Sequence, residues 1–249
     1  MLWCQVVPPE NQPESELHKN SGVFEVPEAG MMLASVTHIV GDKLGFTRSL
    51  DKQQSMLGDG QPIPMMSYAL VEYLMGIDLS AFDILELGGG ESTAFWASKA
   101  KSVTTLETNA EWAASLRQRN LPHTDIRHVE AEMLPAAIGA LGHSFDAIIV
   151  DASASRYAAA KASLPLLKPG GFILLDNADW YPNTTAMLRQ ADLIQMDFAD
   201  FRPLRWFRCV SSLFLHPQFR ARPVPGKALP VTPLGGKNMA VGNNWDAIV

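Results

Sequence analysis

Cysteine and long apolar runs are both scarce in this sequence. Its only cysteines are Cys4 and Cys209, too few for the disulfide framework of a small secreted domain, which indicates a reducing cytoplasm. No apolar run approaches the roughly 20 residues that span a bilayer, so we expect no membrane partner. The first residues, MLWCQVVPPENQ, lack a basic region ahead of a long apolar stretch and do not resemble a signal peptide.

Positive charge is also in short supply. The sequence has 20 Lys and Arg residues against 26 Asp and Glu residues, a formal net charge of −6. Broad nucleic-acid binding works through phosphate neutralisation, so we expect no nucleic-acid partner. The 249 residues, 47% of them hydrophobic and 18% charged, are typical of a globular protein with one sizeable core.

Prolines divide the chain into three parts. Nine of the 17 prolines lie in residues 1–60 and 217–249, which indicates one folded body with loosely built ends. We therefore expect an N-terminal arm and cap segment over 1–60, a folded domain over 61–216 and a Pro/Gly-rich tail over 217–249. Residues 1–30 are typical of an extended or disordered arm. The mixed signals over 31–60 predict no particular element.

Strand-like and helix-like segments alternate through the middle of the chain. Short runs of apolar or β-branched residues predict strands at 82–87, 102–107, 125–129, 145–150 and 172–176. Helices are predicted at 65–75, 92–101, 110–120 after an Asn109 cap, 132–141, 155–167 and 183–191. Two further runs, roughly 194–201 and 209–215, are typical of an antiparallel pair at the end of a sheet. The alternation predicts a doubly wound α/β sheet with ligands at the carboxyl ends of its strands.

A glycine-rich loop, Glu86-Leu87-Gly88-Gly89-Gly90-Glu91-Ser92, joins the first predicted strand to its helix. Glycine lets the backbone approach a ligand, although a tight turn also selects it. Glu107 ends the second strand 19 residues after Gly88, where a carboxylate can accept hydrogen bonds from ribose hydroxyls. Glu86 would repel a pyrophosphate and attract an ammonium group, and Thr93 replaces the third glycine of a dinucleotide fingerprint. The loop therefore favours a cationic nucleoside over NAD.

Four motifs in order carry a resemblance to a known family. They are E-L-G-G-G-E-S, the acidic end of the second strand, F-D-A-I-I-V-D and L-L-K-P-G-G-F-I-L-L-D. Over about residues 60–216 they resemble the class I S-adenosylmethionine-dependent methyltransferases. The resemblance implies a Rossmann-like seven-stranded sheet with an antiparallel terminal strand, and S-adenosyl-L-methionine as the cofactor.

The resemblance also implies positions for the cofactor. The methionine part would lie beside the glycine loop, the ribose at Glu107, and the adenine amino group at Glu130 or, alternatively, Glu132. Asp151 would face the methionine end and the substrate as the catalytic residue. The cofactor-binding set is Glu86, Gly88, Gly89, Gly90, Ser92, Glu107, Glu130 and Asp151. Ser92 replaces a third glycine found in many family members, and a serine there suits a helix N-cap.

Three oxygen-bearing side chains follow the fourth and fifth predicted strands, Asp151 and the pair Asp176-Asn177. Neighbouring strand ends lie about 5 Å apart, so these side chains could converge on a hard cation such as Mg²⁺. The pattern is similar to the metal triad of the catechol and caffeoyl-CoA O-methyltransferases, in which the ion activates one of two vicinal hydroxyls. Where that family has a lysine base, this sequence has Ala154. The alternatives are a metal acting alone, another base, or no metal and a simple turn at Asp176-Asn177.

Other side chains near these strand ends leave their roles open. The stretch from Met56 through the helix at 65–75 looks like the substrate-covering segment of that methyltransferase group. Trp180 and Tyr181 either wall a substrate or pack as lid residues. Arg156 either grips an anionic substrate or, as is commoner, lies on a solvated helix face. A basic bias on the C-terminal region usually means only solubility; it comes from Arg202, Arg205, Arg208, Arg220 and Arg222. Cys209 is expected to be a buried strand cysteine.

The sequence thus predicts a methyltransferase that acts on an oxygen or nitrogen of a small molecule or glycan, with Asp151 orienting the acceptor or a metal. One alternative is an aminopropyltransferase of the spermidine-synthase kind, whose loop also runs G-G-G. Those enzymes follow the fourth strand with acidic residues, where this chain has Ala152-Ser153-Ala154-Ser155. Another alternative is a non-catalytic scaffold that keeps the fold, which the missing lysine allows. The sequence predicts no oligomeric state.

Overall fold

The computed structural model describes residues 28–236, so the arm expected at the N-terminus, with Cys4, and the end of the tail lie outside the described residues. The chain divides into two compact units, Met1–Val36 and Thr37–Val249. The described part of the first unit is helix α1 (Ala29–Val36). All other elements belong to the second unit. No helix among the described residues is long and apolar enough to cross a membrane.

The second unit is built on one seven-stranded sheet with the order β3-β2-β1-β4-β5-β7-β6. Its strands are β1 (Asp83–Leu87), β2 (Ser102–Glu107), β3 (Thr124–His128), β4 (Phe145–Val150), β5 (Leu167–Leu175), β6 (Ile194–Arg202) and β7 (Arg205–Leu215). The first five strands run parallel, and β7 is antiparallel to both β5 and β6. This confirms the predicted Rossmann-like sheet with its antiparallel terminal strand.

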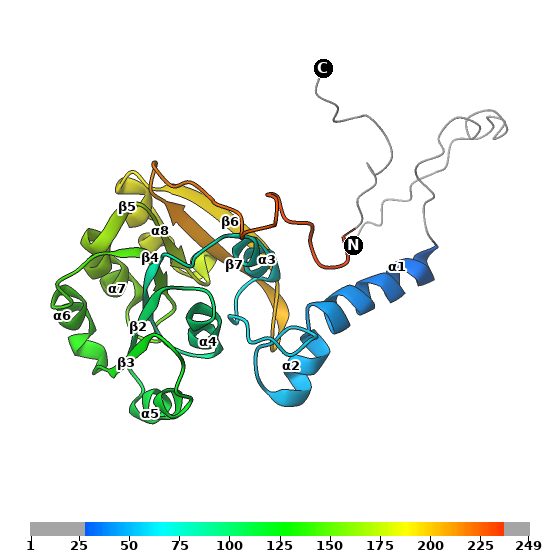
Figure 1. Ribbon diagram of the computed structural model, residues 1–249, viewed down its shortest axis with the longest axis horizontal. Coiled ribbons are helices and arrows are strands. Elements are labelled where there is room, and N and C mark those ends of the chain that lie inside the picture. Colours follow the sequence, from blue (N-terminus) through cyan, green and yellow to red (C-terminus); the bar gives the residue numbers. More distant parts are fainter. Residues whose placement is uncertain (1–27, 237–249) are drawn as a thin grey trace, which may run out of the picture. The chain divides into compact units, whose positions relative to one another are not determined.

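Helices cover both faces of this sheet. Figure 1 shows α6 and α7 on one side and α3 and α4 on the other. The α-helices of the unit are α2 (Phe46–Lys52), α3 (Tyr68–Gly76), α4 (Glu91–Ala97), α5 (Ala110–Gln118), α6 (Leu134–Gly139), α7 (Arg156–Ser163) and α8 (Pro182–Gln190). Short helical segments are the π-helix η1 (Thr37–Lys43) and the 3₁₀ turns η2 (Ala131–Met133), η3 (Leu164–Leu166) and η4 (Ala178–Trp180).

Alternate residues of the central strands supply two separate cores. In β4, Ala147 and Ile149 face the core that includes α3 and α4, whereas Ile148 and Val150 face the core that includes α6, α7 and α8. Because a parallel sheet is covered on both faces, its strands need apolar residues at every position. This is why the continuous apolar runs of the sequence predicted these strands well.

The segment before the sheet, for which the sequence predicted no element over 31–60, forms η1 and α2 in the second unit. The helix expected over 65–75 begins three residues later, at Tyr68, because Ser67 is its N-cap and its hydroxyl accepts a hydrogen bond from the Leu70 N–H. Met65 therefore lies in the loop that leads into α3.

The C-terminal residues 217–236 run along the body of the second unit. The Phe219 ring packs edge-on against Phe172 of β5, with 5.9 Å between ring centroids. The Asp78 N–H donates to the Arg222 carbonyl, and the Leu234 N–H donates to the Glu72 carboxylate. This part of the tail is a packed segment that helps to bury one side of the sheet.

Candidate functional site

In the glycine loop between β1 and α4, two glycines are in close contact with neighbouring atoms, and the third has open space around its Cβ position. Gly88 has φ +95°, and a Cβ there would lie 2.7 Å from the carbonyl oxygen of Asp151. A Cβ on Gly89 would lie 2.7 Å from Leu116 Cδ1. Gly90 has extended backbone, and the nearest atom to a Cβ would be Ser92 Oγ at 3.8 Å. The turn therefore requires Gly88, close packing against Leu116 favours Gly89, and neither the turn nor packing requires Gly90.

Glu86 supports this loop from beneath. Its side chain is completely buried, and its carboxylate accepts hydroxyl hydrogen bonds from Ser92 (2.5 Å), Thr93 (2.6 Å) and Thr105 (2.8 Å). Burial raises the pKa of Glu86 to about 7, although the three hydroxyls act in the opposite direction. Glu86 lines neither of the two cavities described below, and its contact with the cofactor stays a prediction.

Ser92 also has a different place from the one expected. Gly90 is the N-cap of α4, and the Thr93 hydroxyl accepts the Gly90 N–H at 3.0 Å. Ser92 is the second residue of the helix and its hydroxyl donates to Glu86. The expectation of a serine N-cap is therefore wrong, because the turn at Gly88 and Gly89 brings the helix start forward by two residues.

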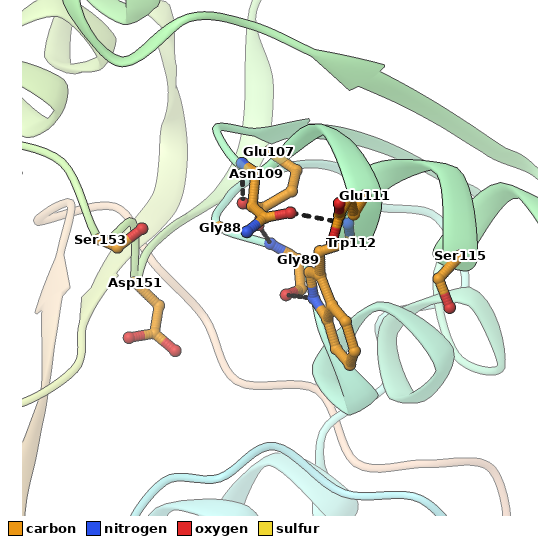
Figure 2. A pocket seen from close by; sticks show the side chains of 9 residues that line it. All are labelled: Gly88, Gly89, Glu107, Asn109, Glu111, Trp112, Ser115, Asp151 and Ser153. Atoms are coloured by element: carbon orange, nitrogen blue, oxygen red, sulfur yellow. Dashed lines mark hydrogen bonds between the residues drawn. The ribbon is translucent and has the colours of Figure 1, made fainter.

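Glu107, at the end of β2, is held by two backbone donors. Its carboxylate oxygens accept the N–H of Gly89 at 2.8 Å and the N–H of Asn109 at 2.7 Å. The Trp112 indole N–H donates to the Gly89 carbonyl at 2.8 Å (Figure 2). Each carboxylate oxygen can accept more than one hydrogen bond, so Glu107 can still bind ligand hydroxyls from this fixed position.

A cavity of about 590 Å³ opens beside these residues at the carboxyl ends of β1, β2 and β4. Figure 2 shows Asp151 and Ser153 on one side of it and the glycine loop, Glu107 and Trp112 on the other. Its lining consists of Gly88, Gly89, Glu107, Asn109, Glu111, Trp112, Ser115, Asp151 and Ser153. The volume lies within the usual range for small-molecule and cofactor sites.

A second cavity of about 550 Å³ shares a wall with the first. The shared residues are Gly89, Trp112, Ser115 and Asp151. Beyond them the second cavity is lined by Gly90 and Ser92 of the loop region, by residues 52–55 at the end of α2, by Met65, and by Leu204 at the turn between β6 and β7. The Ser55 hydroxyl is buried and, among the described residues, has no hydrogen-bond partner.

Asp151 lies where the two cavities meet. Its side chain is 27% exposed, and one of its oxygens accepts a hydrogen bond from Arg156 Nη2 at 2.6 Å. Burial raises the pKa of Asp151 to about 7, with a further increase from Asp176, while Arg156 and Arg202 lower it. Asp151 is thus the one carboxylate that reaches both cavities.

The three residues predicted to bind a metal do come together, but two arginines lie among them. Arg202 Nη1 is 3.3 Å from Asp176 Oδ2, and Asp176 also accepts the Ser211 hydroxyl at 2.6 Å. In the amide orientation that satisfies both of its ends, Asn177 donates to Asp176 and accepts from Arg202 Nη1 at 2.6 Å. Each of the three triad side chains therefore accepts a hydrogen bond from, or pairs with, a guanidinium group, and an arrangement with two fixed cations does not fit a divalent ion. No cluster of three or more His, Cys, Asp or Glu side chains suited to a metal exists within residues 28–236.

The acidic residues proposed for the adenine end lie apart from both cavities. The Glu130 side chain is 71% exposed, and its Oε1 lies 3.7 Å from His128 Nε2. Neither Glu130 nor Glu132 lines the two cavities. A contact of Glu130 with the cofactor stays a prediction.

Several residues of the site were missed or misjudged from the sequence. Trp112 and Ser115 line both cavities from α5, and no motif pointed to them. Arg156 and Arg202 were expected on solvated surfaces, and both are buried. Tyr181 lies beneath Arg156, whose guanidinium carbon is 4.7 Å from the ring centroid. The expected burial of Cys209 is confirmed.

Comparison with known families supports the class of protein that this fold and site define. Residues 85–178, from β1 to the start of η4, match the family model described as a methyltransferase domain. This region contains the glycine loop, Glu107 and Asp151. The matched region is thus a methyltransferase domain, and its sheet order with an antiparallel last strand agrees with the class I S-adenosylmethionine-dependent methyltransferase that the sequence motifs predicted.

Solved structures with a similar arrangement are distant in sequence. A putative O-methyltransferase from Klebsiella pneumoniae is 21% identical, with a TM-score of 0.46 over 60% of this chain and 78% of that chain. A precorrin-6y C5,15-methyltransferase from Geobacter metallireducens is 11% identical, with a TM-score of 0.48 over 59% and 86%. An rRNA methylase from Streptococcus thermophilus is 16% identical, with a TM-score of 0.44 over 61% and 99%. No curated protein sequence gives a significant match.

Proposed function

We propose that this methyltransferase acts on an oxygen or nitrogen atom of a small molecule or glycan held in the second cavity. The observation that supports this most is the wall shared by the two cavities, with Asp151 at their junction. A methyl donor in one cavity and an acceptor in the other would meet beside this carboxylate. Most of the catalysis would then come from positioning the two reactants.

The first cavity suits the nucleoside part of S-adenosylmethionine. Glu107 would accept the ribose hydroxyls, because two backbone N–H groups already fix its orientation. Gly90, with open space where a side chain would project, would let the backbone approach the methionine part of the cofactor. When bound, the cofactor supplies an electrophilic methyl group on a positively charged sulfur.

The polar lining of the second cavity favours an acceptor that carries several polar groups. Its lining includes Lys52, Gln53, Gln54 and Ser55. The Ser55 hydroxyl has no hydrogen-bond partner among the described residues. Asp151 would accept a hydrogen bond from the acceptor hydroxyl or amine and so fix the direction of its lone pair.

Aromatic side chains follow Leu204, a lining residue of the same cavity, closely in the sequence. Trp180 and Trp206 are exposed, and their ring centroids lie 6.3 and 5.6 Å from that of Phe207. Exposed rings of this kind suit a sugar or aromatic part of an acceptor that extends out of the cavity.

A turnover screen with isotopically labelled cofactor tests this proposal. Panels of hydroxylated small molecules, amines and oligosaccharides are compared with RNA. We expect methylation of a small molecule or glycan, with Asp151→Asn lowering kcat at least tenfold. The matched variant Asp179→Asn, an exposed carboxylate at the same sheet edge, should keep wild-type rates. Methylation of RNA alone would overturn the proposal.

A further inference from the structure

We propose that Arg156 and Arg202 together take the place that a divalent cation holds in the metal-dependent O-methyltransferases, so that this enzyme positions Asp151 without a metal. The inference rests on the proposed function, because Asp151 is the residue that would orient the acceptor. It is carried by the contacts of the two guanidinium groups and by the charge balance around them.

Arg156 joins the ends of two neighbouring strands. Its Nη2 donates to Asp151 Oδ1 at 2.6 Å, and its Nε donates to the Ala152 carbonyl at 3.2 Å, both just after β4. Its Nη1 donates to the Asp176 carbonyl just after β5. One guanidinium therefore holds three oxygens from two strand ends, which is the bridging that a cation would provide.

Arg202, from the end of β6, holds the remaining two predicted ligands. It contacts the Asp176 carboxylate and the Asn177 amide oxygen. The side chains of Asp176 and Arg202 are 0% and 5% exposed, so this pair is shielded from water. The Ser211 hydroxyl occupies the other Asp176 oxygen.

Formal charge supports the same conclusion. When ionised, Asp151 and Asp176 carry two negative charges, and Arg156 and Arg202 balance them with two positive charges at short distances. A divalent cation added to this neutral cluster would leave two uncompensated positive charges in a buried place, which is strongly unfavourable. Two guanidinium groups therefore supply the positive charge that one divalent ion would supply.

The consequence concerns the acceptor class. Without a Lewis acid, nothing at these three residues would lower the pKa of a vicinal diol in the way that a bound ion does. The acceptor atom is therefore one that needs no Lewis acid, namely the nitrogen of an amine, which is nucleophilic in its neutral form and can donate an N–H to Asp151.

The first test measures Mn²⁺ binding by electron paramagnetic resonance in the presence of S-adenosylhomocysteine. Wild type and Asp151→Asn should give superimposable Mn²⁺ titrations, since Asp151 is not a metal ligand. One equivalent of Mn²⁺ that binds wild type and is lost in Asp151→Asn would overturn the inference. This readout needs no turnover, and S-adenosylhomocysteine binding in the same samples reports separately on the cofactor site of the proposed function.

The second test removes a guanidinium. Arg156→Met should lower the melting temperature by about 10 °C, because a buried ion pair is broken, and added Mn²⁺ should recover part of this loss. Arg119→Met is the matched control, because Arg119 pairs with Glu91 at the same cavity but outside the triad. Its melting temperature should not respond to Mn²⁺. An Arg156→Met protein that melts like the wild type, or a wild type that Mn²⁺ stabilises as much as the variant, would overturn the inference.

Discussion

The variants Gly88→Ala and Gly90→Ala separate two reasons for glycine in the loop, namely the backbone conformation of the turn and the space that a ligand needs. Gly88 needs its positive φ, which costs an alanine about 1–2 kcal/mol, and a Cβ there would also overlap the Asp151 backbone, which costs about 1–3 kcal/mol. Gly88→Ala should therefore lower the free energy of unfolding by about 2–5 kcal/mol. Gly90 has extended backbone and open space around its Cβ position, so Gly90→Ala should change stability by less than about 0.5 kcal/mol.

The effect of Gly90→Ala should instead be on cofactor binding. A methyl group beside the cavity would hold the ligand away from the loop backbone, and a lost hydrogen bond to a charged group is worth about 1.5–3 kcal/mol. The dissociation constant of S-adenosylhomocysteine should rise about 10- to 150-fold by isothermal titration calorimetry, while urea unfolding stays as in the wild type. A folded Gly90→Ala protein with wild-type affinity would refute the assignment of Gly90 to the cofactor.

Three further substitutions test other contacts. Glu86→Gln removes a carboxylate whose pKa is about 7 in the folded protein, against an ordinary value of 4.5. Because a raised pKa stabilises the fold only at low pH, the free energy of unfolding of the wild type should fall by about 2–3 kcal/mol between pH 5 and 8, and that of the variant should not. Urea unfolding measures both, and parallel pH profiles would contradict the burial argument. Trp112→Phe removes the indole donor to Gly89 and should lower the free energy of unfolding by about 1 kcal/mol and weaken S-adenosylhomocysteine binding severalfold; unchanged calorimetry would show that this bond does not hold the loop. Trp206→Ala, at a side chain 85% exposed, should raise the acceptor KM severalfold in steady-state assays without changing stability or cofactor affinity; an unchanged KM would remove Trp206 from the acceptor surface.

Most of the fold follows from local sequence patterns. Strands buried on both faces, such as Ile148 and Ile149 in β4, leave a continuous apolar run that has few other interpretations. β5 begins at Leu167, five residues before the predicted strand. The prediction missed this first part because it contains Lys168-Pro169-Gly170-Gly171, a sequence typical of a loop. Gly171 lies so close to the Asp146 carbonyl that a side chain would not fit, and such close approach is a reason for glycine inside a strand.

The candidate site was harder to predict, because its key contacts join distant parts of the chain. Glu107 and the glycine loop were found by their order and spacing. The burial of Glu86 depends on hydroxyls from α4 and β2, and Thr93 was considered only as a missing glycine. Arg202 reaches Asp176 across β7, which lies between β5 and β6 in the sheet, and no short-range pattern marks an arginine that will be buried in this way.

The central claim is that a cofactor bound in the first cavity is held by Glu107. Calorimetry of S-adenosylhomocysteine with wild type, Glu107→Gln and the control Asp125→Asn, an exposed carboxylate on β3, tests it most directly. We predict one binding site in wild type and control, and a dissociation constant at least tenfold higher for folded Glu107→Gln. A folded wild type that binds no S-adenosylhomocysteine, or equal affinity in Glu107→Gln, would contradict the account.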